Sequence, residues 1–159
     1  MEQRLARRIA LITGAADGIG LAMARRFAGE GAEVIMADVN NAAVSDAAAL
    51  IGGSARAIAV DVTDRASVLA MMAAAGPVDI LVNNDWGGNG PARIENKDDD
   101  LFDRALRMGV WACKWSMEAA LPHMKAQEWG RVINIASLNG VNAHMGTAEY
   151  NSSKEALRA

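Results

Sequence analysis

A serine, a tyrosine and a lysine near the end of the sequence have the types and spacing needed for proton transfer at an alcohol or carbonyl oxygen. Ser137 follows the strand-like segment 132–136, and Lys154 lies four positions after Tyr150. On a helix this spacing places both side chains on one face. A tyrosine can act as a general acid or base near neutral pH if an ammonium group stabilises its phenolate, and a serine hydroxyl can orient the reacting oxygen. Tyr150 is the only tyrosine in the chain, so no other phenol competes for this role.

A glycine-rich turn near the start of the chain could hold a pyrophosphate. The run 9–13 is apolar and suits a buried strand. It leads directly into a turn and a helix, and glycines at this position let the backbone approach a phosphate at the helix N-terminus. The spacing is Gly-x-x-x-Gly-x-Gly, and a turn of this kind also occurs in α/β domains that bind nothing. The predicted cofactor contacts here are Thr13, Gly14, Asp17, Gly18, Ile19 and Gly20.

Acidic residues that follow the next two strands could bind the adenosine part of a dinucleotide. Asp38 ends the apolar run 33–38 and is placed to accept hydrogen bonds from both ribose hydroxyls. Its charge, with that of Asp17, would repel a 2′-phosphate, which favours NAD over NADP. The alternative for Asp38 is a helix N-cap, although Asn40 and Asn41 could fill that role.

Two further strand ends supply the remaining cofactor candidates. Asp61 and Val62 follow the third strand and could contact the adenine, and Thr63 is the better candidate for the next helix cap. The fourth strand ends in Asn83 and Asn84, and the glycines that follow suggest a cavity wall beside a ligand. We assign Asn84 to the cofactor site, with a simple Asx turn as the alternative.

The order of strand-like and helical segments predicts an α/β fold, a Rossmann-like doubly wound parallel sheet, in one domain over residues 1–159. In such a sheet the carboxyl ends of the strands meet at one edge, where chemistry should take place. The predicted helices are 19–29, 42–51, 64–75 and a long helix 98–125. The predicted strands are Ile9–Thr13, Glu33–Asp38, Ala57–Val60, Val78–Val82 and Arg131–Ala136.

Composition narrows the class of ligand. The 159 residues are 52% hydrophobic, but no apolar run approaches the roughly 20 residues needed to cross a bilayer. A net charge of −3 and few aromatic residues give no general attraction to nucleic acid. The single cysteine, Cys113, fits a reducing, cytoplasmic location, and neither histidine has partners at metal-ligand spacing, so we predict no metal. A small-molecule substrate is expected.

Taken together, these motifs resemble the short-chain dehydrogenase/reductase family, in its shorter, non-extended type. The turn 13–20, Asp38, the Asp61-Val62 and Asn83-Asn84 pairs, Ser137 and the Tyr-x-x-x-Lys pair occur in the family's order and at its separations. The resemblance implies NAD(P)-dependent interconversion of a secondary alcohol and a ketone.

The resemblance also assigns roles to residues. Tyr150 would give or take the proton, while Lys154 would stabilise its phenolate and bind the nicotinamide ribose. Ser137 would hold the reacting oxygen. The family further implies a homo-oligomer, a dimer or tetramer, formed through the long helix and the Tyr-Lys helix.

Two positions depart from the family pattern around this site. Counting back from Pro122, Gly109 stands where the family has an asparagine that completes a proton relay through water. Asp85 and Trp86 stand where the family has alanine and glycine beside the cofactor. The relay is therefore expected to be absent or to use another group, and the cofactor site is expected to be reshaped.

A third departure is length. Family members run to about 250 residues, and this sequence stops five residues after Lys154. The sequence therefore predicts a fragment in which the strand 131–136 is an unpaired, aggregation-prone edge. The alternative function is a dinucleotide-binding module without turnover. A nucleotide-sugar epimerase of the extended type is disfavoured by the glycine spacing.

Several other residues have structural explanations. Met108, Trp111 and Trp115 form a stripe at helical spacing that predicts core packing, with an oligomer contact as the alternative. Cys113 should pack as a small apolar side chain. His144 lies in the loop before Tyr150, where it could face substrate or serve only as a loop residue.

Overall fold

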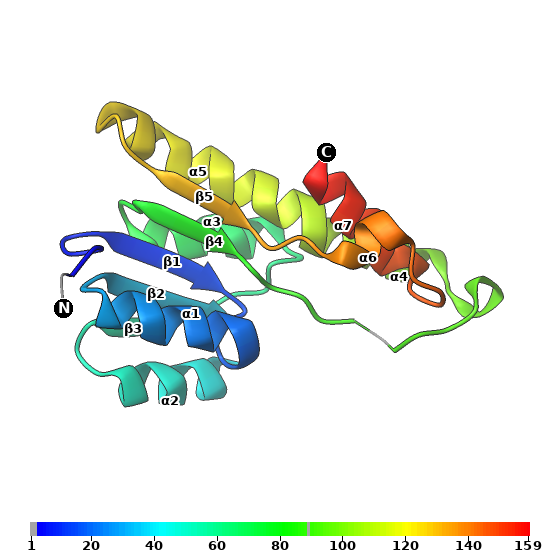
Figure 1. Ribbon diagram of the computed structural model, residues 1–159, viewed down its shortest axis with the longest axis horizontal. Coiled ribbons are helices and arrows are strands. Elements are labelled where there is room, and N and C mark those ends of the chain that lie inside the picture. Colours follow the sequence, from blue (N-terminus) through cyan, green and yellow to red (C-terminus); the bar gives the residue numbers. More distant parts are fainter. Residues whose placement is uncertain (1–2, 89) are drawn as a thin grey trace.

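The computed structural model describes residues 3–88 and 90–159 and contains a parallel sheet with helices on both faces (Figure 1). The strand order is β3-β2-β1-β4-β5. All four strand pairings are parallel, as the sequence predicted. The strands are β1 (Ile9–Thr13), β2 (Glu33–Asp38), β3 (Ala55–Ala59), β4 (Ile80–Asn83) and β5 (Arg131–Asn134).

The helices differ from the prediction mainly in the second half of the chain. Instead of one long helix, α4 runs through a π-helical turn, η2, into α5, and two elements that the sequence analysis did not assign, the 3-10 turn η1 and helix α6, flank this region. The Tyr-Lys helix is present as α7. The helical elements are α1 (Gly18–Gly29), α2 (Asn41–Ile51), α3 (Arg65–Ala75), η1 (Ile94–Asn96), α4 (Asp99–Leu106), η2 (Arg107–Trp111), α5 (Ala112–Ala126), α6 (Leu138–Asn142) and α7 (Ala148–Arg158).

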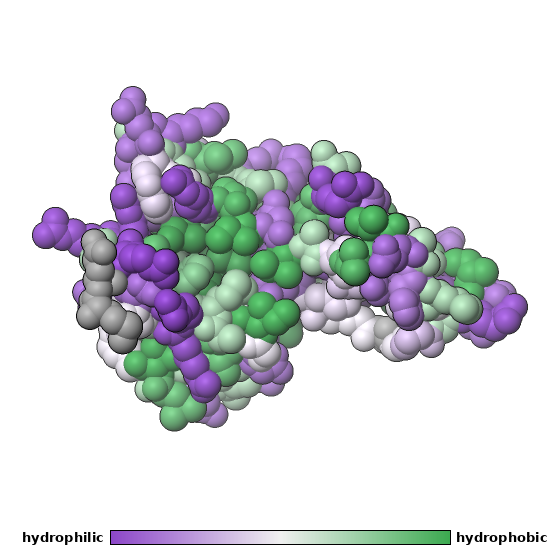
Figure 2. Space-filling view, in the orientation of Figure 1, coloured by the Kyte–Doolittle hydropathy of each residue, from purple (hydrophilic) through white to green (hydrophobic). Residues whose placement is uncertain are grey.

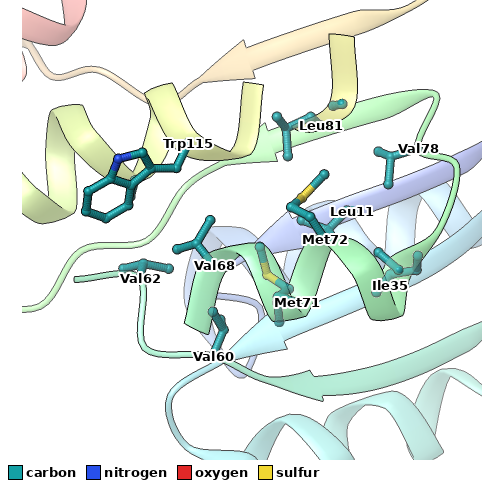
Figure 3. Close-up of a cluster of buried hydrophobic side chains, with 14 of the residues drawn as sticks. Leu11, Ile35, Val60, Val62, Val68, Met71, Met72, Val78, Leu81 and Trp115 are labelled. Atoms are coloured by element: carbon teal, nitrogen blue, oxygen red, sulfur yellow. The ribbon is translucent and has the colours of Figure 1, made fainter. Parts of the chain in front are cut away.

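Alternation along the strands divides the core into two layers. Ala10, Ile12, Val34 and Met36 point toward α1 and α2, and the residues between them point toward α3 and α5. Figure 3 shows the second layer, in which side chains of α3 and Trp115 of α5 face the sheet. Because both faces of β1 and β2 are covered, these strands are buried and almost continuously apolar.

Strand β5 lies at the edge of the sheet, beside β4. Ile133 pairs with Val82 and therefore belongs to the face that α1 and α2 cover farther along the sheet. Its side chain is nevertheless 37% exposed. Figure 2 shows apolar residues gathered on this side of the molecule next to α1. This part of the sheet surface therefore carries exposed apolar side chains.

Helix caps correct one detail of the sequence analysis. Asn40 accepts a hydrogen bond from the Ala43 N–H and caps α2, which leaves Asp38 free of that role. Helix α3 is capped by Asp64, whose carboxylate accepts from two main-chain N–H groups at the helix start. The prediction of Thr63 as this cap was wrong, because its hydroxyl donates to Asp61 instead.

Candidate functional site

The turn after β1 brings main chain against main chain, and this requires glycine. Gly14 and Gly18 have φ angles of +60° and +51°, which favour glycine. A Cβ on Gly20 would lie 2.1 Å from the carbonyl oxygen of Gly14. Helix α1 therefore begins tightly against the end of β1, and no side chain caps its first N–H groups. This arrangement leaves those N–H groups available to a phosphate.

Two of the predicted cofactor residues hold the turn in place. The hydroxyl of Thr13 accepts hydrogen bonds from the main-chain N–H groups of Asn84 and Asp85, at 3.0 and 3.2 Å. The side-chain amide of Asn84 donates to the carbonyl oxygens of Thr13 and Gly14. These bonds join the glycine turn to the segment after β4, so both residues shape the wall of the site.

A groove of about 450 Å³ runs across the carboxyl ends of β1, β2 and β3 and reaches the segment after β4. Most of the predicted cofactor residues line it. Other residues that line it were not predicted, including Arg104 of α4 and Met108 of η2. Thr13 and Lys154 line a smaller cavity next to it. The predicted residues in the groove are Gly14, Asp17, Ile19, Asp38, Asp61, Val62 and Asn84.

Asp38 is fixed in the groove by main-chain donors. One carboxylate oxygen accepts from the Ala16 N–H at 3.1 Å, and the other accepts from the Asn40 N–H at 2.9 Å. Each carboxylate oxygen can accept a further hydrogen bond, so the group can still bind two hydroxyls. The glycine turn and this carboxylate together fit the pyrophosphate and ribose of a dinucleotide.

Asp61 lies on the same side of the groove. Hydrogen bonds from the Thr63 hydroxyl and main-chain N–H lower the pKa of Asp61, so the group is ionised at neutral pH. The positive charge of Arg104 acts in the same direction. The adenosine end of the groove is therefore acidic, with one arginine at its border.

Tyr150 and Lys154 lie one turn apart on α7, as predicted from their spacing. The Lys154 ammonium lies 5.8 Å from the centre of the Tyr150 ring and donates to the Ile135 carbonyl at 2.7 Å. Burial lowers the pKa of Lys154, and the nearby groups Cys113 and Asp85 oppose that shift. Tyr150 is half-buried. The helix therefore presents a phenol with a buried cation beside it.

Ser137 lies at the N-terminus of α6, where its hydroxyl oxygen accepts from the Asn139 N–H at 3.2 Å. It follows β5 directly, and α6 packs against α7. The serine and the tyrosine thus belong to adjacent elements beyond the carboxyl end of β5 (Figure 1).

Trp86 contacts the tyrosine directly. The two rings meet edge to face, with centroids 4.6 Å apart and an angle of 64° between their planes. The Lys154 ammonium also lies 5.4 Å from the centre of the Trp86 ring. The sequence analysis expected the indole to reshape the cofactor site. In the structure Trp86 packs between the groove and the Tyr-Lys pair.

Asp85 is the other unusual residue of this segment. Burial raises the pKa of Asp85 to about 6, and the negative charges of Asp38 and Asp61 add to that effect. Lys154 and Arg104 act in the opposite direction. The side chain is half-buried, so the carboxyl group titrates close to neutral pH rather than near 4.

At Gly109 the structure explains why a side chain does not fit. A Cβ there would lie 1.8 Å from the Ser153 hydroxyl, which donates to the Ala105 carbonyl. The π-helical turn and α7 are in close contact at this point. The asparagine of the family pattern is replaced by direct packing of η2 against the Tyr-Lys helix.

A buried ion pair anchors the start of α7. The Lys97 ammonium and a Glu149 carboxylate oxygen lie 2.7 Å apart, and the side chains are 1% and 4% exposed. Neither atom has a hydrogen bond of good geometry within the described residues. The sequence analysis missed this pair because 52 positions separate its members, and no local pattern joins them.

The remaining candidate residues have mainly structural positions. Met108 and Trp115 are buried, whereas Trp111 is 46% exposed and stacks on Trp115. Cys113 is buried in the core, as predicted. His144 is exposed, and its ring hydrogen-bonds to the Met145 carbonyl.

Neither a metal-ligand cluster nor a helix fit to span a membrane is present in residues 3–88 and 90–159. No group of three or more histidine, cysteine, aspartate and glutamate side chains is arranged to hold a metal ion. Over the same residues, none of the helices has the length and apolar character that a membrane span requires.

Comparison with known proteins agrees with this geometry. The family model for short chain dehydrogenases matches residues 8–159. The protein belongs to the short-chain dehydrogenase family. A crystal structure of the 3-ketoacyl-(acyl-carrier-protein) reductase from Brucella melitensis, complexed with NADH, superimposes with a TM-score of 0.91 at 35% identity, and covers 96% of this chain and 66% of that one.

Curated family members include an uncharacterized oxidoreductase of Bacillus subtilis, 40% identical over 95% of this chain, and the galactitol 2-dehydrogenase of Agrobacterium fabrum, 38% identical over 97%. The chain spans 61% and 62% of the lengths of these two relatives. The resemblance seen in the motifs is thus confirmed at the level of family and fold.

Proposed function

We propose that the protein is an NAD-dependent oxidoreductase that interconverts a secondary alcohol and a ketone, with Ser137, Tyr150 and Lys154 as its catalytic residues. The observation that carries the proposal is the placement of Tyr150 beside a buried ammonium group, with Trp86 between the tyrosine and a groove suited to a dinucleotide. A buried cation favours the phenolate, which is the base that alcohol oxidation needs.

The roles follow from position. The substrate hydroxyl would donate its proton to Tyr150 while Ser137 holds the same oxygen. Lys154 stabilises the negative charge on the phenol oxygen. NAD would supply the nicotinamide ring that accepts the hydride from the substrate carbon. In the direction of ketone reduction, Tyr150 returns the proton to the oxygen.

The choice of NAD over NADP rests on charge. A 2′-phosphate would have to lie beside the Asp38 carboxylate, with Asp17 also in the groove. Arg104 lies at the border of the same groove, but Asp38 occupies the strand end where the ribose hydroxyls are expected. The Brucella reductase structure, which is complexed with NADH, is in line with this choice.

We also propose a homo-oligomer formed through the long helical region and α7, and a cytoplasmic location. Trp111 is 46% exposed on the long helical region, and Leu106 and Leu121 are each more than a third exposed. Exposed apolar side chains of this kind are suited to contact with a second copy.

The decisive experiment is a turnover assay of the purified protein with NAD and a panel of secondary alcohols, including polyols. Tyr150→Phe should lower kcat at least about 10³-fold, since it removes the proton-transferring oxygen. Ser152→Ala is the matched control, because Ser152 is an exposed residue of the same helix. Loss of turnover in both variants, or in neither, contradicts the proposed roles.

A second candidate is a dinucleotide-binding module without turnover. It is favoured by the fact that the groove is built from β1 to β4 and α4, away from α7. Calorimetric titration with NAD and NADP separates the two candidates. Tight NAD binding with no turnover on any alcohol or ketone tested would favour the binding module.

A further inference from the structure

A small cavity lined by Lys154 lies next to the groove and shares three lining residues with it. Its volume is about 10 Å³, which is close to the size needed for one water molecule. Asp85, Gly109 and Lys154 are among the residues that line it. We call this space the lysine cavity.

Asp85 is shared between the lysine cavity and the groove. Val62 and Met108 also line both spaces, but neither side chain can carry a proton. Among the described residues, Asp85 is therefore the ionisable group that faces the buried lysine on one side and the open groove on the other.

The other polar side chains of the lysine cavity all take part in hydrogen bonds, and the Thr13 hydroxyl, which accepts from two main-chain N–H groups, does not ionise at neutral pH. The Ser116 hydroxyl donates within its own helix or to the Asn83 side chain, and the Asn83 amide donates to Asn134. Burial raises the pKa of the Cys113 thiol to about 11, so this group stays protonated. Gly109 contributes no side chain. Lys154 and Asp85 are left as the two groups of this cavity that can exchange protons at neutral pH.

We propose that Asp85 passes protons between the Tyr150-Lys154 pair and the groove, through one water molecule in the lysine cavity. This inference rests on the proposed function, in which Tyr150 gains a proton in each turnover. During alcohol oxidation that proton moves from the Tyr150 oxygen to Lys154 as the ammonium releases one of its own. The released proton passes through the water to the Asp85 carboxylate, which then gives it to solvent in the groove.

The charges around Asp85 suit this role. Asp38 and Asp61 face it across the groove, whereas Lys154 and Arg104 oppose them. A carboxyl group with a pKa near 6 can both accept and release a proton at neutral pH. A carboxyl group with its ordinary pKa would release the proton readily but would be a weaker acceptor.

The test compares the pH dependence of turnover in the wild type and in Asp85→Asn. The variant keeps the shape of the side chain but cannot carry a proton. We expect kcat to fall about 100-fold, which is the low end of effects for general acid-base groups, and the limb of the kcat profile near pH 6 to disappear. The substrate KM should change much less. Asp85→Glu should recover part of the activity, and Asp46→Asn, an exposed change on α2, should behave as the wild type.

Two outcomes overturn the proposal. One is an Asp85→Asn enzyme with wild-type kcat and an unchanged pH profile. The other is an Asp85→Asn enzyme with low activity at all pH values and an intact limb near pH 6, because that pattern describes a structural role.

The connection between Asp85 and Lys154 can also be tested if the proposed function fails. If the wild type binds NAD without turnover, the carboxyl ¹³C resonance of Asp85 is titrated in the same full chain. The proposal then requires that Lys154→Met raises the pKa of Asp85 by at least about half a unit, because the variant removes the facing positive charge. An Asp85 titration that Lys154→Met leaves unchanged overturns the proposed connection.

Discussion

The groove and the tyrosine helix are positioned by different kinds of interaction. Each contact that sets the groove involves the main chain: Gly20 packs on Gly14, and the side chains that hold the turn and the strand ends bond to backbone N–H or C=O groups. Side chains set α7, through the Lys97-Glu149 ion pair and the Trp86-Tyr150 ring contact. The part that would bind an invariant cofactor thus depends on backbone shape, and the part that would meet a variable substrate depends on replaceable side chains.

The buried ion pair offers the largest test of this contrast. Glu149→Gln leaves the Lys97 ammonium buried without a counter-charge and should lower the free energy of unfolding by about 3–5 kcal/mol. Urea unfolding followed by circular dichroism measures the change. Lys97→Met combined with Glu149→Leu should restore most of the loss, since no unpaired charge remains. Glu118→Gln breaks an exposed pair with Lys114 and should have no measurable effect.

Adding one methyl group at Gly20 should distort the glycine turn that forms one wall of the groove. Gly20→Ala places a Cβ against the Gly14 carbonyl oxygen and should cost about 3 kcal/mol, with a loss of NAD affinity measurable by calorimetry. Gly29→Ala is the control in the same helix, because a Cβ there meets no atom within 4 Å. Equal stability of the two variants would show that the turn is not held by this contact.

Substitution of Asp85 should change the free energy of unfolding by an intermediate amount that depends on pH. Its folded-state pKa of about 6 lies above the ordinary value of 3.8, so the folded state binds more protons between these values. Stability contributed by the protonated form is therefore lost as pH rises from 4 to 7. Relative to wild type, Asp85→Asn should gain about 2 kcal/mol over that range. Denaturant titrations at pH 4, 5, 6 and 7 measure the difference, and a constant difference would contradict the raised pKa.

The smallest effect is expected at Asp38. Asp38→Asn keeps a hydrogen-bonding group at the strand end but removes the charge, so NAD affinity should fall about 10-fold, equivalent to about 1.4 kcal/mol. Affinity for NADP should fall less or rise, because the repulsion of a 2′-phosphate is removed. Calorimetry with both nucleotides gives the ratio, and Asp46→Asn serves as the charge control.

Local patterns in the sequence predicted the sheet and the glycine turn because those elements depend on periodicity and backbone freedom. Apolar runs gave β1, β2 and β4 closely, and the four-residue spacing gave the helix of Tyr150 and Lys154. Strand ends shifted by one or two residues, as at β3, where loop hydrogen bonds decide the boundary.

The contacts that position the candidate catalytic residues correspond to no local pattern in the sequence. Lys97, which follows η1, meets Glu149 at the start of α7 only once the chain has folded, and Gly109 of the π-helical turn packs closely on Ser153. Trp86 stood out in the sequence as a bulky residue, but its partner Tyr150 could be identified only once the elements were packed. These contacts are properties of the tertiary structure.

The rate at which the Cys113 thiol reacts with a reagent measures how often the lysine cavity opens. Its thiol is 4% exposed, donates to the Gly109 carbonyl and lines the same space as Lys154. A thiol reagent can therefore reach the sulfur only when the packing around this cavity opens. The labelling rate of Cys113, divided by that of the unfolded chain, gives the fraction of time for which the lysine cavity is open. Binding of a dinucleotide in the adjoining groove should lower this rate.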